Sequence, residues 1–407
     1  MTRIKHLTII LFLGFYMINC YSQDIKFNKD SLLKIDTYFN DQIDANKLAG
    51  AITLIAINGN TEQLKSYGQL DIADSIKMNK DVMIPIASMT KIITSIAILQ
   101  LQESGQLNID DPIDKYFPEF RNIKVLVNPD SSTTEELKHK PTIRDFLRHT
   151  AGMVYTGGNT YADSLYKEAG FRTWNGSLDG FIKKVSSIPL AYQPNQNWIY
   201  SYSHDVLGYL VEIVSGKPLN DYCMENIFQP LGLKNTGFYV PREKSDRLSN
   251  LYIFSNDTLV VEDSKDASIY NYLPSAISGG GGWWSSYGGV VTTIEDFYVI
   301  TQLMLNYGTL NDVKILNETS VKSMISNQIG DLDAYGTKYG LGVGVIMSED
   351  GSELTNEIYW AGAPYNTYFW IDYKESIIGI LFTNTAPFGH LGMMGHFKEL
   401  TENAIEE

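Results

Sequence analysis

Ser88 and Lys91 are the two residues of this chain whose types and spacing point most directly to covalent chemistry. Residues three apart in a helix lie on one face, one turn from each other. A serine hydroxyl becomes a nucleophile when a neighbouring base takes its proton, and a lysine desolvated by apolar walls gives up its own proton more easily. Ser88 and Lys91 are therefore a candidate nucleophile and base for hydrolysis without a histidine.

The spacing alone does not identify the site, because segments 31–34 and 164–167 also begin with serine and end with lysine. The residues after each lysine distinguish the three. Residues 92–101 are apolar on nearly every side, as in a buried helix, whereas the other two pairs stand in polar, charged stretches. A surface serine with a chance lysine is the ordinary interpretation of such a match. Burial of the helix favours Ser88 over that interpretation.

Two further stretches could complete such a site. Tyr200 stands just before a helix predicted over 203–215, and a phenol acts as a base when a nearby ammonium stabilises its phenolate. In the reverse step the same phenol protonates a leaving alkoxide. The segment 360–363 ends a predicted strand, where the N–H groups of Ala363 and Ser88 could form an oxyanion hole. The alternatives are a packed tyrosine and an ordinary strand end with a core tryptophan.

Three other features are candidates for the cleft. The glycines at 278–282 lack the lysine and the strand-to-helix setting of a phosphate loop, so they are either a wall of the cleft with Trp283 lining it or a plain loop. His149 is expected to be a structural hydrogen-bonding residue. His204, close to Tyr200, has a better claim to the cleft.

The elements that must position these residues come from both ends of the chain. A helix is predicted over 30–42, and the middle of the chain is rich in helix signals, including capping boxes at 142–145 and 293–296 and a closing glycine at Gly216. Alternating strands are predicted over 51–56, 62–68, 340–347, 357–360, 365–371 and 376–383, with turns at 350–351 and 372–375. The expected fold is α+β, with one antiparallel sheet built from both chain ends, flanked by helices, and an inserted, mostly helical domain.

The predicted division is residues 24–87 plus 331–407 for the α/β domain and 88–330 for the mostly helical domain, with the active site at their junction. Residues 1–23 have the basic start, apolar run and polar exit of an export signal, so the protein is expected to be periplasmic or secreted. Cys20 offers a second possibility, a lipid-anchored protein.

Composition excludes other classes of function. The net charge of −15 makes nucleic acid an unsuitable partner, and the six histidines form no metal-binding pattern. We therefore expect no metal and no cofactor, and a small-molecule ester or amide as the partner. The pattern assigns no oligomeric state.

Taken together, the motifs resemble the serine β-lactamase and penicillin-binding protein superfamily, specifically its class C-related branch with esterase-like members. The resemblance covers roughly residues 30–400 and rests on Ser88-x-x-Lys91, Tyr200-Ser201 and Trp360-x-Gly362, supported by the stretches 142–152, 200–208 and 278–282. It implies a β-lactamase/transpeptidase-like fold. It also implies Ser88 as the nucleophile, Lys91 as its activating partner, Tyr200 as general base and acid, and the N–H groups of Ser88 and Ala363 as the oxyanion hole.

Two departures from the family pattern bear on the substrate. Trp360 stands where β-lactamases and many D,D-peptidases have the lysine or histidine that precedes Thr-Gly, and Tyr202 stands where they have asparagine. A cation at position 360 would pair with a substrate carboxylate, whereas tryptophan offers an apolar face and one N–H donor. Members with tryptophan here look like carboxylesterases. The expected substrate-binding residues are Trp360, Gly362, Tyr202, His204 and Trp283.

The sequence thus predicts an exported serine hydrolase that forms an acyl-enzyme on Ser88 and resembles a carboxylesterase. One alternative keeps the mechanism and makes the protein a D-aminopeptidase, D,D-peptidase or β-lactamase. An alternative of another class is a binding or sensor protein that uses the fold without turnover.

Overall fold

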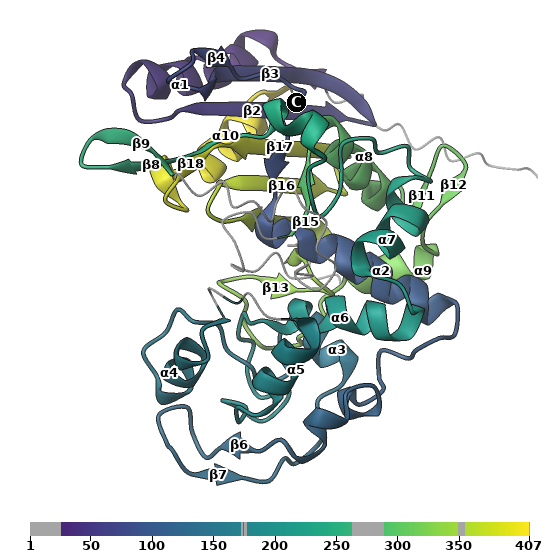
Figure 1. Ribbon diagram of the computed structural model, residues 1–407. Coiled ribbons are helices and arrows are strands. Elements are labelled where there is room, and N and C mark those ends of the chain that lie inside the picture. The colour runs from purple at the N-terminus through teal and green to yellow at the C-terminus, as the bar shows by residue number, and fades with distance from the viewer. Residues whose placement is uncertain (1–25, 172–173, 175–176, 263–288, 349–354, 407) are drawn as a thin grey trace, which may run out of the picture.

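An antiparallel sheet forms the upper part of the molecule in the computed structural model, which describes residues 26–171, 174, 177–262, 289–348 and 355–406 (Figure 1). Its strands are β2 (Gly50–Ile57), β3 (Asn60–Asp71), β4 (Ile76–Lys77), β13 (Lys338–Tyr339), β14 (Gly344–Met347), β15 (Thr355–Gly362), β16 (Thr367–Asp372) and β17 (Ile377–Thr383). Among the described residues the order of these eight strands is β13-β14-β15-β16-β17-β2-β3-β4.

The sheet joins the two ends of the chain through β2 and β17. These strands pair antiparallel, with Leu54 opposite Ile380. The predicted fold class, an α+β protein with one antiparallel sheet from both chain ends, is therefore confirmed. β2 differs from the half-buried alternation predicted for it, because all of its residues are buried. Helices cover both faces of the sheet at this strand, so neither set of its side chains meets water.

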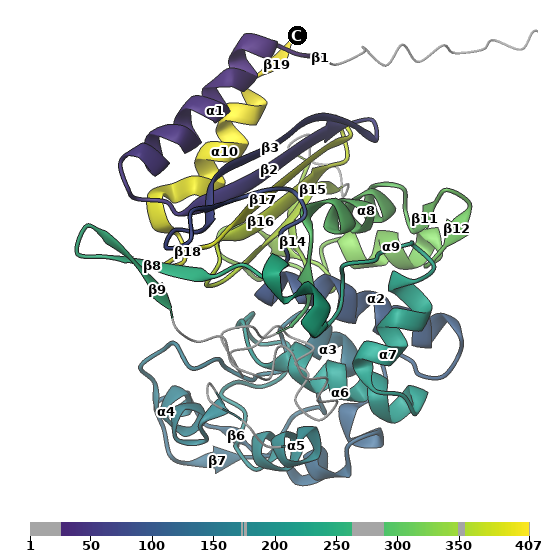
Figure 2. The same cartoon turned by 45° about the horizontal axis from the view of Figure 1, so that its top comes forward.

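On the outer face of the sheet lie α1 (Lys29–Asp44) and α10 (Met393–Glu402), side by side in Figure 2. Their buried side chains, among them Phe39 and Phe397, form an apolar layer with Trp370 of β16. The opposite face packs against α8 (Ile294–Leu305). Helix α8 lies in the interval 88–330 assigned to the helical domain but covers the sheet; the domain boundaries stay predictions.

The lower part of the molecule is built around α2 (Thr90–Glu103), which is buried on every side through most of its length. It packs against α6 (Ser203–Ser215), which packs in turn against α3 (Ile143–Leu147). The predicted ends of these helices are present: Thr142 and Asp145 form a capping box for α3, and Gly216 closes α6 with a φ of 70°. In that left-handed conformation glycine carries no steric penalty.

Shorter elements complete the described structure. The remaining helices are α4 (Tyr161–Glu168), α5 (Leu178–Ser186), α7 (Leu219–Cys223) and α9 (Glu318–Ile325). Short segments of 3-10 or π helix span Ala87–Met89, Ile113–Lys115, Pro118–Asn122, Met224–Phe228, Arg242–Arg247 and His390–Gly392. Small sheets pair β1 (Lys26–Phe27) with β19 (Ile405–Glu406), β5 (Ile84–Pro85) with β10 (Val291–Thr292), β6 (Val125–Leu126) with β7 (Thr134–Glu135), β11 (Thr309–Leu310) with β12 (Val313–Lys314), and β8 (Leu251–Ser255) with both β9 (Thr258–Glu262) and β18 (Thr385–Ala386).

Two predicted elements differ in detail from those in the structure. The strand predicted over 340–347 begins later, since only β14 (Gly344–Met347) lies in that range; residues 340–343 connect it to β13, and the chain turns at Gly342 with a φ of 95°. Thr293 caps α8 as predicted, but the carboxylate of Asp296 accepts from Asn235 and Thr236. The turn predicted at 350–351 and the glycine segment 278–282 lie outside the described residues. No helix in the described part of the chain is long and apolar enough to cross a membrane.

Candidate active site

Ser88 lies in a single 3-10 turn, η1 (Ala87–Met89), which runs directly into α2. The residue before it, Ala87, has a φ of 43°, in the left-handed region that favours glycine. Neighbouring backbone holds this conformation. The N–H of Ile86 donates to the carbonyl of Val290 at 2.9 Å, and the N–H of Val290 donates to Thr90 Oγ1 at 2.8 Å. The turn carrying Ser88 is therefore fastened on both sides to one segment.

Tyr200 meets Ser88 at the start of α6. Its phenol donates a hydrogen bond to Ser88 Oγ at 2.7 Å, within the usual range for two hydroxyl groups. The two residues are 112 positions apart in the chain. Packing of α6 against α2 therefore creates the pair.

Lys91 completes the group from the first turn of α2. Its side chain is almost fully buried, and Nζ lies 4.7 Å from the centre of the Tyr200 ring. Burial lowers the pKa of Lys91 to about 7, because a charged ammonium loses its hydration there, while the negative charge of Asp205 acts in the opposite direction. At neutral pH a large share of Lys91 is thus an uncharged amine that can accept a proton.

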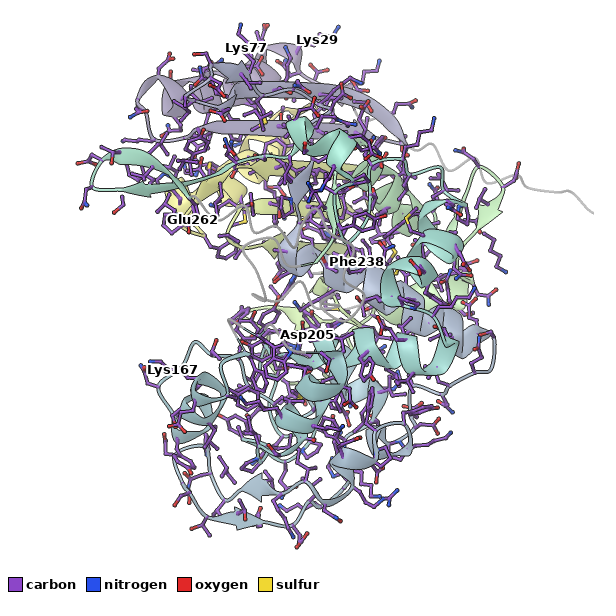
Figure 3. The ribbon with its side chains drawn as sticks, viewed as in Figure 1. Lys29, Lys77, Lys167, Asp205, Phe238 and Glu262 are labelled. Atoms are coloured by element: carbon purple, nitrogen blue, oxygen red, sulfur yellow. The ribbon has the colours of Figure 1, made fainter. Side chains whose placement is uncertain are left out.

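The phenol of Tyr200, unlike the amine of Lys91, keeps its proton at neutral pH. Burial raises its pKa well above the ordinary value, and the charge of Asp205 adds to this effect, whereas the hydrogen bond with Ser88 and the side chain of Trp360 lower it. Tyr200 is therefore protonated at rest and donates to Ser88. Asp205, buried in the first turn of α6, lies where the upper and lower parts of the molecule meet (Figure 3).

Burial separates the three serine and lysine spacings as the sequence predicted. Lys91 is 2% exposed, whereas Lys34 and Lys167 are exposed. Lys167 lies at the edge of the molecule (Figure 3). Ser31 and Ser164 are partly accessible in surface helices. Neither of these two pairs therefore has the burial that distinguishes Ser88 and Lys91.

The end of β15 approaches Ser88 from the sheet. Strand β14 pairs with β15 only as far as Tyr359, so residues 360–362 have no partner on that edge among the described strands. Gly362 allows the close approach, because a Cβ there would lie 2.3 Å from the carbonyl oxygen of Ile86. Ala363 comes next in the chain and lines the same cavity as Ser88. This arrangement is compatible with the predicted oxyanion hole, whose two N–H donors would come from η1 and the end of β15.

A cavity of about 370 Å³ opens beside these residues. Its described walls are mostly aromatic or aliphatic and include no charged side chain. Trp360, predicted to contact substrate, lines it, with its ring centre 5.7 Å from that of Tyr200. The structure thus brings Ser88, Lys91, Tyr200, Trp360 and Ala363 together.

Two other predicted substrate contacts lie behind the site. Tyr202 is fully buried and stacks on Tyr155 with ring centres 4.3 Å apart. His204 is also fully buried, with Nε2 3.1 Å from Ser95 Oγ of α2. Neither lines the cavity: Tyr202, at the N-cap of α6, and His204, in its first turn, are buried in the core in the position of packing residues. Trp283 lies outside the described residues.

His149 has the structural role predicted for it. Its Nδ1 accepts from the backbone N–H of Ser201 at 3.3 Å, which fastens the segment carrying Tyr200. Burial lowers the pKa of His149 well below its ordinary value, and the nearby charge of Lys91 adds to this. The ring is therefore neutral at physiological pH.

Sequence reasoning missed several residues around Ser88. Asp205 lies inside the family-like stretch 200–208, but no pattern indicated that its charge would reach Lys91 and Tyr200. The remaining cavity walls, Tyr335, Tyr359, Tyr368, Phe388 and Met394, come from separate elements and carry no shared spacing. In the described part of the chain no cluster of three or more histidine, cysteine, aspartate or glutamate side chains could hold a metal ion.

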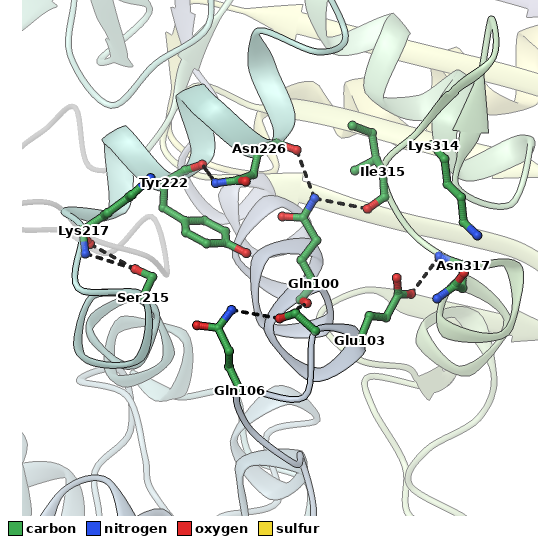
Figure 4. Close-up of a pocket in the computed structure, with 11 residues that line it drawn as sticks. Gln100, Glu103, Gln106, Ser215, Lys217, Tyr222, Asn226, Lys314, Ile315 and Asn317 are labelled. Atoms are coloured by element: carbon green, nitrogen blue, oxygen red, sulfur yellow. Dashed lines mark hydrogen bonds between the residues drawn. The ribbon is translucent and has the colours of Figure 1, made fainter.

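A second hollow, of about 570 Å³, lies at the other end of α2 (Figure 4). It contains none of the predicted site residues. Gln100 donates there from Nε2 to the carbonyls of Asn226 and Ile315, and Glu103 accepts from the N–H of Asn317. Its polar side chains tie neighbouring loops to α2.

Known proteins are similar to this chain in sequence and in fold. The model of the family described as Beta-lactamase matches residues 35–396. Esterase EstB of Burkholderia gladioli is 30% identical over 208 residues, covering 50% of this chain and 51% of that protein. A putative D-alanyl-D-alanine carboxypeptidase of Escherichia coli is 28% identical over 343 residues, covering 78% and 72%. The solved structure of EstCE1, a hydrolase with promiscuous acyltransferase activity, superposes with a TM-score of 0.76 at 21% identity, over 92% of this chain and 98% of its own.

Proposed function

Because this chain belongs to the Beta-lactamase family and is a serine hydrolase, we propose that it is a carboxylesterase that forms an acyl-enzyme on Ser88. The observation that carries the proposal is the 2.7 Å hydrogen bond from Tyr200 to Ser88 beside the buried amine of Lys91. The esterase relative supports an ester as the substrate. Placement in the class C-related branch stays a prediction.

Acylation begins with attack of Ser88 Oγ on the ester carbonyl carbon. The serine proton passes to the pair formed by Tyr200 and Lys91. Within this pair the neutral amine of Lys91 is the group that can accept a proton, because the phenol of Tyr200 is protonated at rest. The carbonyl oxygen becomes an oxyanion held by the N–H groups of Ser88 and Ala363. The carbon–oxygen bond to the alcohol then breaks, and Tyr200 returns the proton to the departing alkoxide.

Deacylation repeats these steps with water. A water molecule attacks the acyl carbon and gives its proton to the same pair, and the bond to Ser88 Oγ breaks. Ser88 leaves as an alkoxide and recovers the proton from Tyr200. The products are a carboxylic acid and the free enzyme with its starting protonation.

The walls of the cavity favour esters over substrates that carry a carboxylate. The described lining has no lysine, arginine or histidine, and Trp360 presents an aromatic face where a cation would stand in a β-lactamase. A substrate carboxylate would lose water there without gaining an ionic partner, which costs free energy. An uncharged acyl group has little hydration free energy to lose on entering the cavity.

Hydrolysis of p-nitrophenyl butyrate by the wild type and two variants tests the proposal. Ser88→Ala should abolish turnover, while Ser164→Ala, at a helical serine of the same spacing, should keep wild-type kcat/KM. Equal activity of Ser88→Ala and the wild type, with both folded by circular dichroism, would overturn the assignment. Intact mass spectrometry with a slow ester should show the acyl mass on the wild type alone.

The E. coli relative favours one other substrate class. Its description as a putative D-alanyl-D-alanine carboxypeptidase makes a D-peptide or a β-lactam the second candidate. Rapid hydrolysis of nitrocefin or of a D-alanyl-D-alanine peptide, with esters turned over slowly, would select that class. A sensor without turnover would instead be labelled by a fluorophosphonate at Ser88 or resist it, and hydrolyse neither substrate.

We also propose that the protein is exported, on the basis of the signal-like sequence of residues 1–23. Expression in a Gram-negative host should yield a mature chain that begins near Gln23, as read by N-terminal sequencing. If the protein is instead lipid-anchored, the mature chain begins at Cys20 and takes up labelled palmitate, and Cys20→Ala abolishes the label. A full-length chain left in the cytosol contradicts both forms.

A further inference from the structure

Two hollows meet at Tyr200 and Tyr335, and they differ in chemistry. The acyl cavity, as we name the cavity of about 370 Å³ beside Ser88, is lined by Ala361, Tyr359, Tyr368, Phe388 and Met394, among other residues. The alcohol hollow, of about 550 Å³, is lined by Tyr155, Tyr192, Trp198, Tyr335, Asp163 and Asp333, among other residues. We propose that the acyl chain of the substrate lies in the acyl cavity, that the alcohol leaves through the alcohol hollow, and that the preferred substrate joins an apolar acyl group to a positively charged alcohol. This proposal rests on the proposed esterase function.

The geometry of the tetrahedral intermediate sets the orientation. Its oxyanion must face the N–H groups of Ser88 and Ala363, at the end of β15. The alcohol oxygen must face Tyr200, since that phenol returns the proton on departure. Ala361 and Ala363 line the acyl cavity alone, whereas Ile199 and Trp198, next to Tyr200 in the chain, line the alcohol hollow alone. The acyl chain is therefore left to lie along the open end of β15.

The acyl cavity is built for a chain longer than acetyl. Ala361 lies on the same face of the sheet as Tyr359 on its own strand and directly opposite Tyr368 on β16, and it leaves space that a larger side chain would fill. Met394, at the beginning of α10, is part of the same lining. No charged or amide side chain lines the described walls. Burial of substrate methylene groups in this cavity therefore stabilises the bound substrate.

The alcohol hollow has aromatic walls and two carboxylates. Ring edges and faces surround it, with the rings of Trp198 and Tyr335 in a T-shaped contact at 4.9 Å. Asp163 is occupied by the capping box of α4, and Asp333 Oδ2 accepts from the N–H of Gly336, so both carboxylates are held in place. The described lining includes no lysine or arginine. Aromatic faces and carboxylates together attract a cation such as a quaternary ammonium, and they disfavour an anion.

The acyl half is tested with p-nitrophenyl esters of increasing chain length. For the wild type, kcat/KM should rise about fourfold per methylene until the chain fills the acyl cavity. Ala361→Leu should lower the ratio of hexanoate to acetate hydrolysis at least tenfold. Ala45→Leu, at an exposed position after α1, is the matched control and should leave the ratio unchanged. An unchanged ratio in Ala361→Leu would overturn the placement of the acyl chain.

The alcohol half is tested with two hexanoate esters that differ in one charge. Choline hexanoate and its uncharged carbon analogue, 3,3-dimethylbutyl hexanoate, have the same shape, and the wild type should prefer the choline ester. Asp333→Asn should reduce that preference about fivefold, as expected for loss of one partly solvated ion contact. Asp331→Asn removes the same charge from an exposed neighbour outside the hollow and should not change it.

The outcomes separate the esterase function from the orientation of the substrate. Failure of the wild type to hydrolyse any ester overturns the proposed function. Ester hydrolysis with no preference for the choline ester, or with equal effects of the two asparagine variants, overturns the alcohol assignment alone. If Asp333→Asn changes the chain-length profile while Ala361→Leu changes the preference for choline, the substrate binds in the reverse orientation.

Discussion

The two ends of helix α2 each lie beside a hollow, but their polar side chains differ in role. Those at one end hold neighbouring segments through hydrogen bonds, and those at the other end are a candidate nucleophile and a buried amine. At the C-terminal end Gln100 and Glu103 bond directly to backbone groups of neighbouring segments beside a hollow of about 570 Å³. At the N-terminal end Ser88 and Lys91 stand beside a smaller hollow of about 370 Å³, with an amine whose pKa burial lowers to about 7. The size of a hollow therefore does not identify a reactive site. Desolvation of an ionisable group next to a nucleophile does.

Among the variants that compare the two ends of α2, the exchange of tyrosine for phenylalanine should give the largest effect. Tyr200→Phe removes the hydroxyl that donates to Ser88 and should lower kcat for p-nitrophenyl butyrate by about 10³-fold, the range for loss of a general acid and base. Tyr222→Phe, in the hollow at the other end, should stay within about twofold of the wild type, because that tyrosine lies away from the reacting atoms. Similar losses in both variants would mean that the comparison of the two ends is wrong.

Lys91→Met should lower esterase activity and raise the stability of the fold. The variant keeps the length of the side chain but has no amine, so esterase activity should fall by at least about 100-fold. The pKa of Lys91 is lower in the folded protein than in the unfolded chain, so the unfolded chain binds more protons between about pH 7 and pH 10. The buried amine therefore destabilises the fold most at pH 7 and below, and this cost disappears as the pH approaches 10.

Urea unfolding at several pH values measures this effect. Lys91→Met should raise the free energy of unfolding by up to about 4 kcal/mol at pH 6 to 7, and the gain should shrink toward pH 10. Lys217→Met, at an exposed ion pair beside the other hollow, is the control and should change stability by less than about 1 kcal/mol. A pH-independent change in Lys91→Met would mean that the amine is not desolvated.

Asp205→Asn should move the pH dependence without removing a reacting group. In the wild type, kcat/KM should rise with pH through about 7 as Lys91 loses its proton. The charge of Asp205 raises the pKa of Lys91, so its removal should shift the acidic limb to lower pH. The shift should be smaller than the effect of desolvation, which is the larger cause. A pH profile identical to that of the wild type would exclude this coupling.

The smallest expected effect on catalysis belongs to Gln100→Ala. It removes two hydrogen bonds that join α2 to the carbonyls of Asn226 and Ile315, so the free energy of unfolding should fall by about 1–3 kcal/mol. Ester hydrolysis below the unfolding temperature should equal that of the wild type. A specific loss of kcat without loss of stability would show that the far end of α2 does communicate with Ser88.

Much of the fold was predictable because its signals are local. Periodic apolar residues located the strands at both ends of the chain, and the caps at Thr142 and Gly216 located helix ends within a residue. The turn at 340–343, before β14, was missed, since glycines in a strand-like stretch do not by themselves reveal a turn. The complete burial of β2 was missed as well, because it depends on helices from distant parts of the chain covering both faces.

By itself, the sequence determined the candidate nucleophile and base. Only one of the three serine and lysine pairs of the same spacing is followed by an apolar helix, and this predicts which lysine is desolvated. It also identified Tyr200, Trp360 and the end of β15 as partners through their resemblance to a family. Tertiary structure alone decided that Tyr202 and His204 point into the core and that Asp205 acts on Lys91. It also decided which aromatic walls form the two hollows. The physical reason is that charge coupling and cavity shape depend on distances through space between residues that share no local pattern.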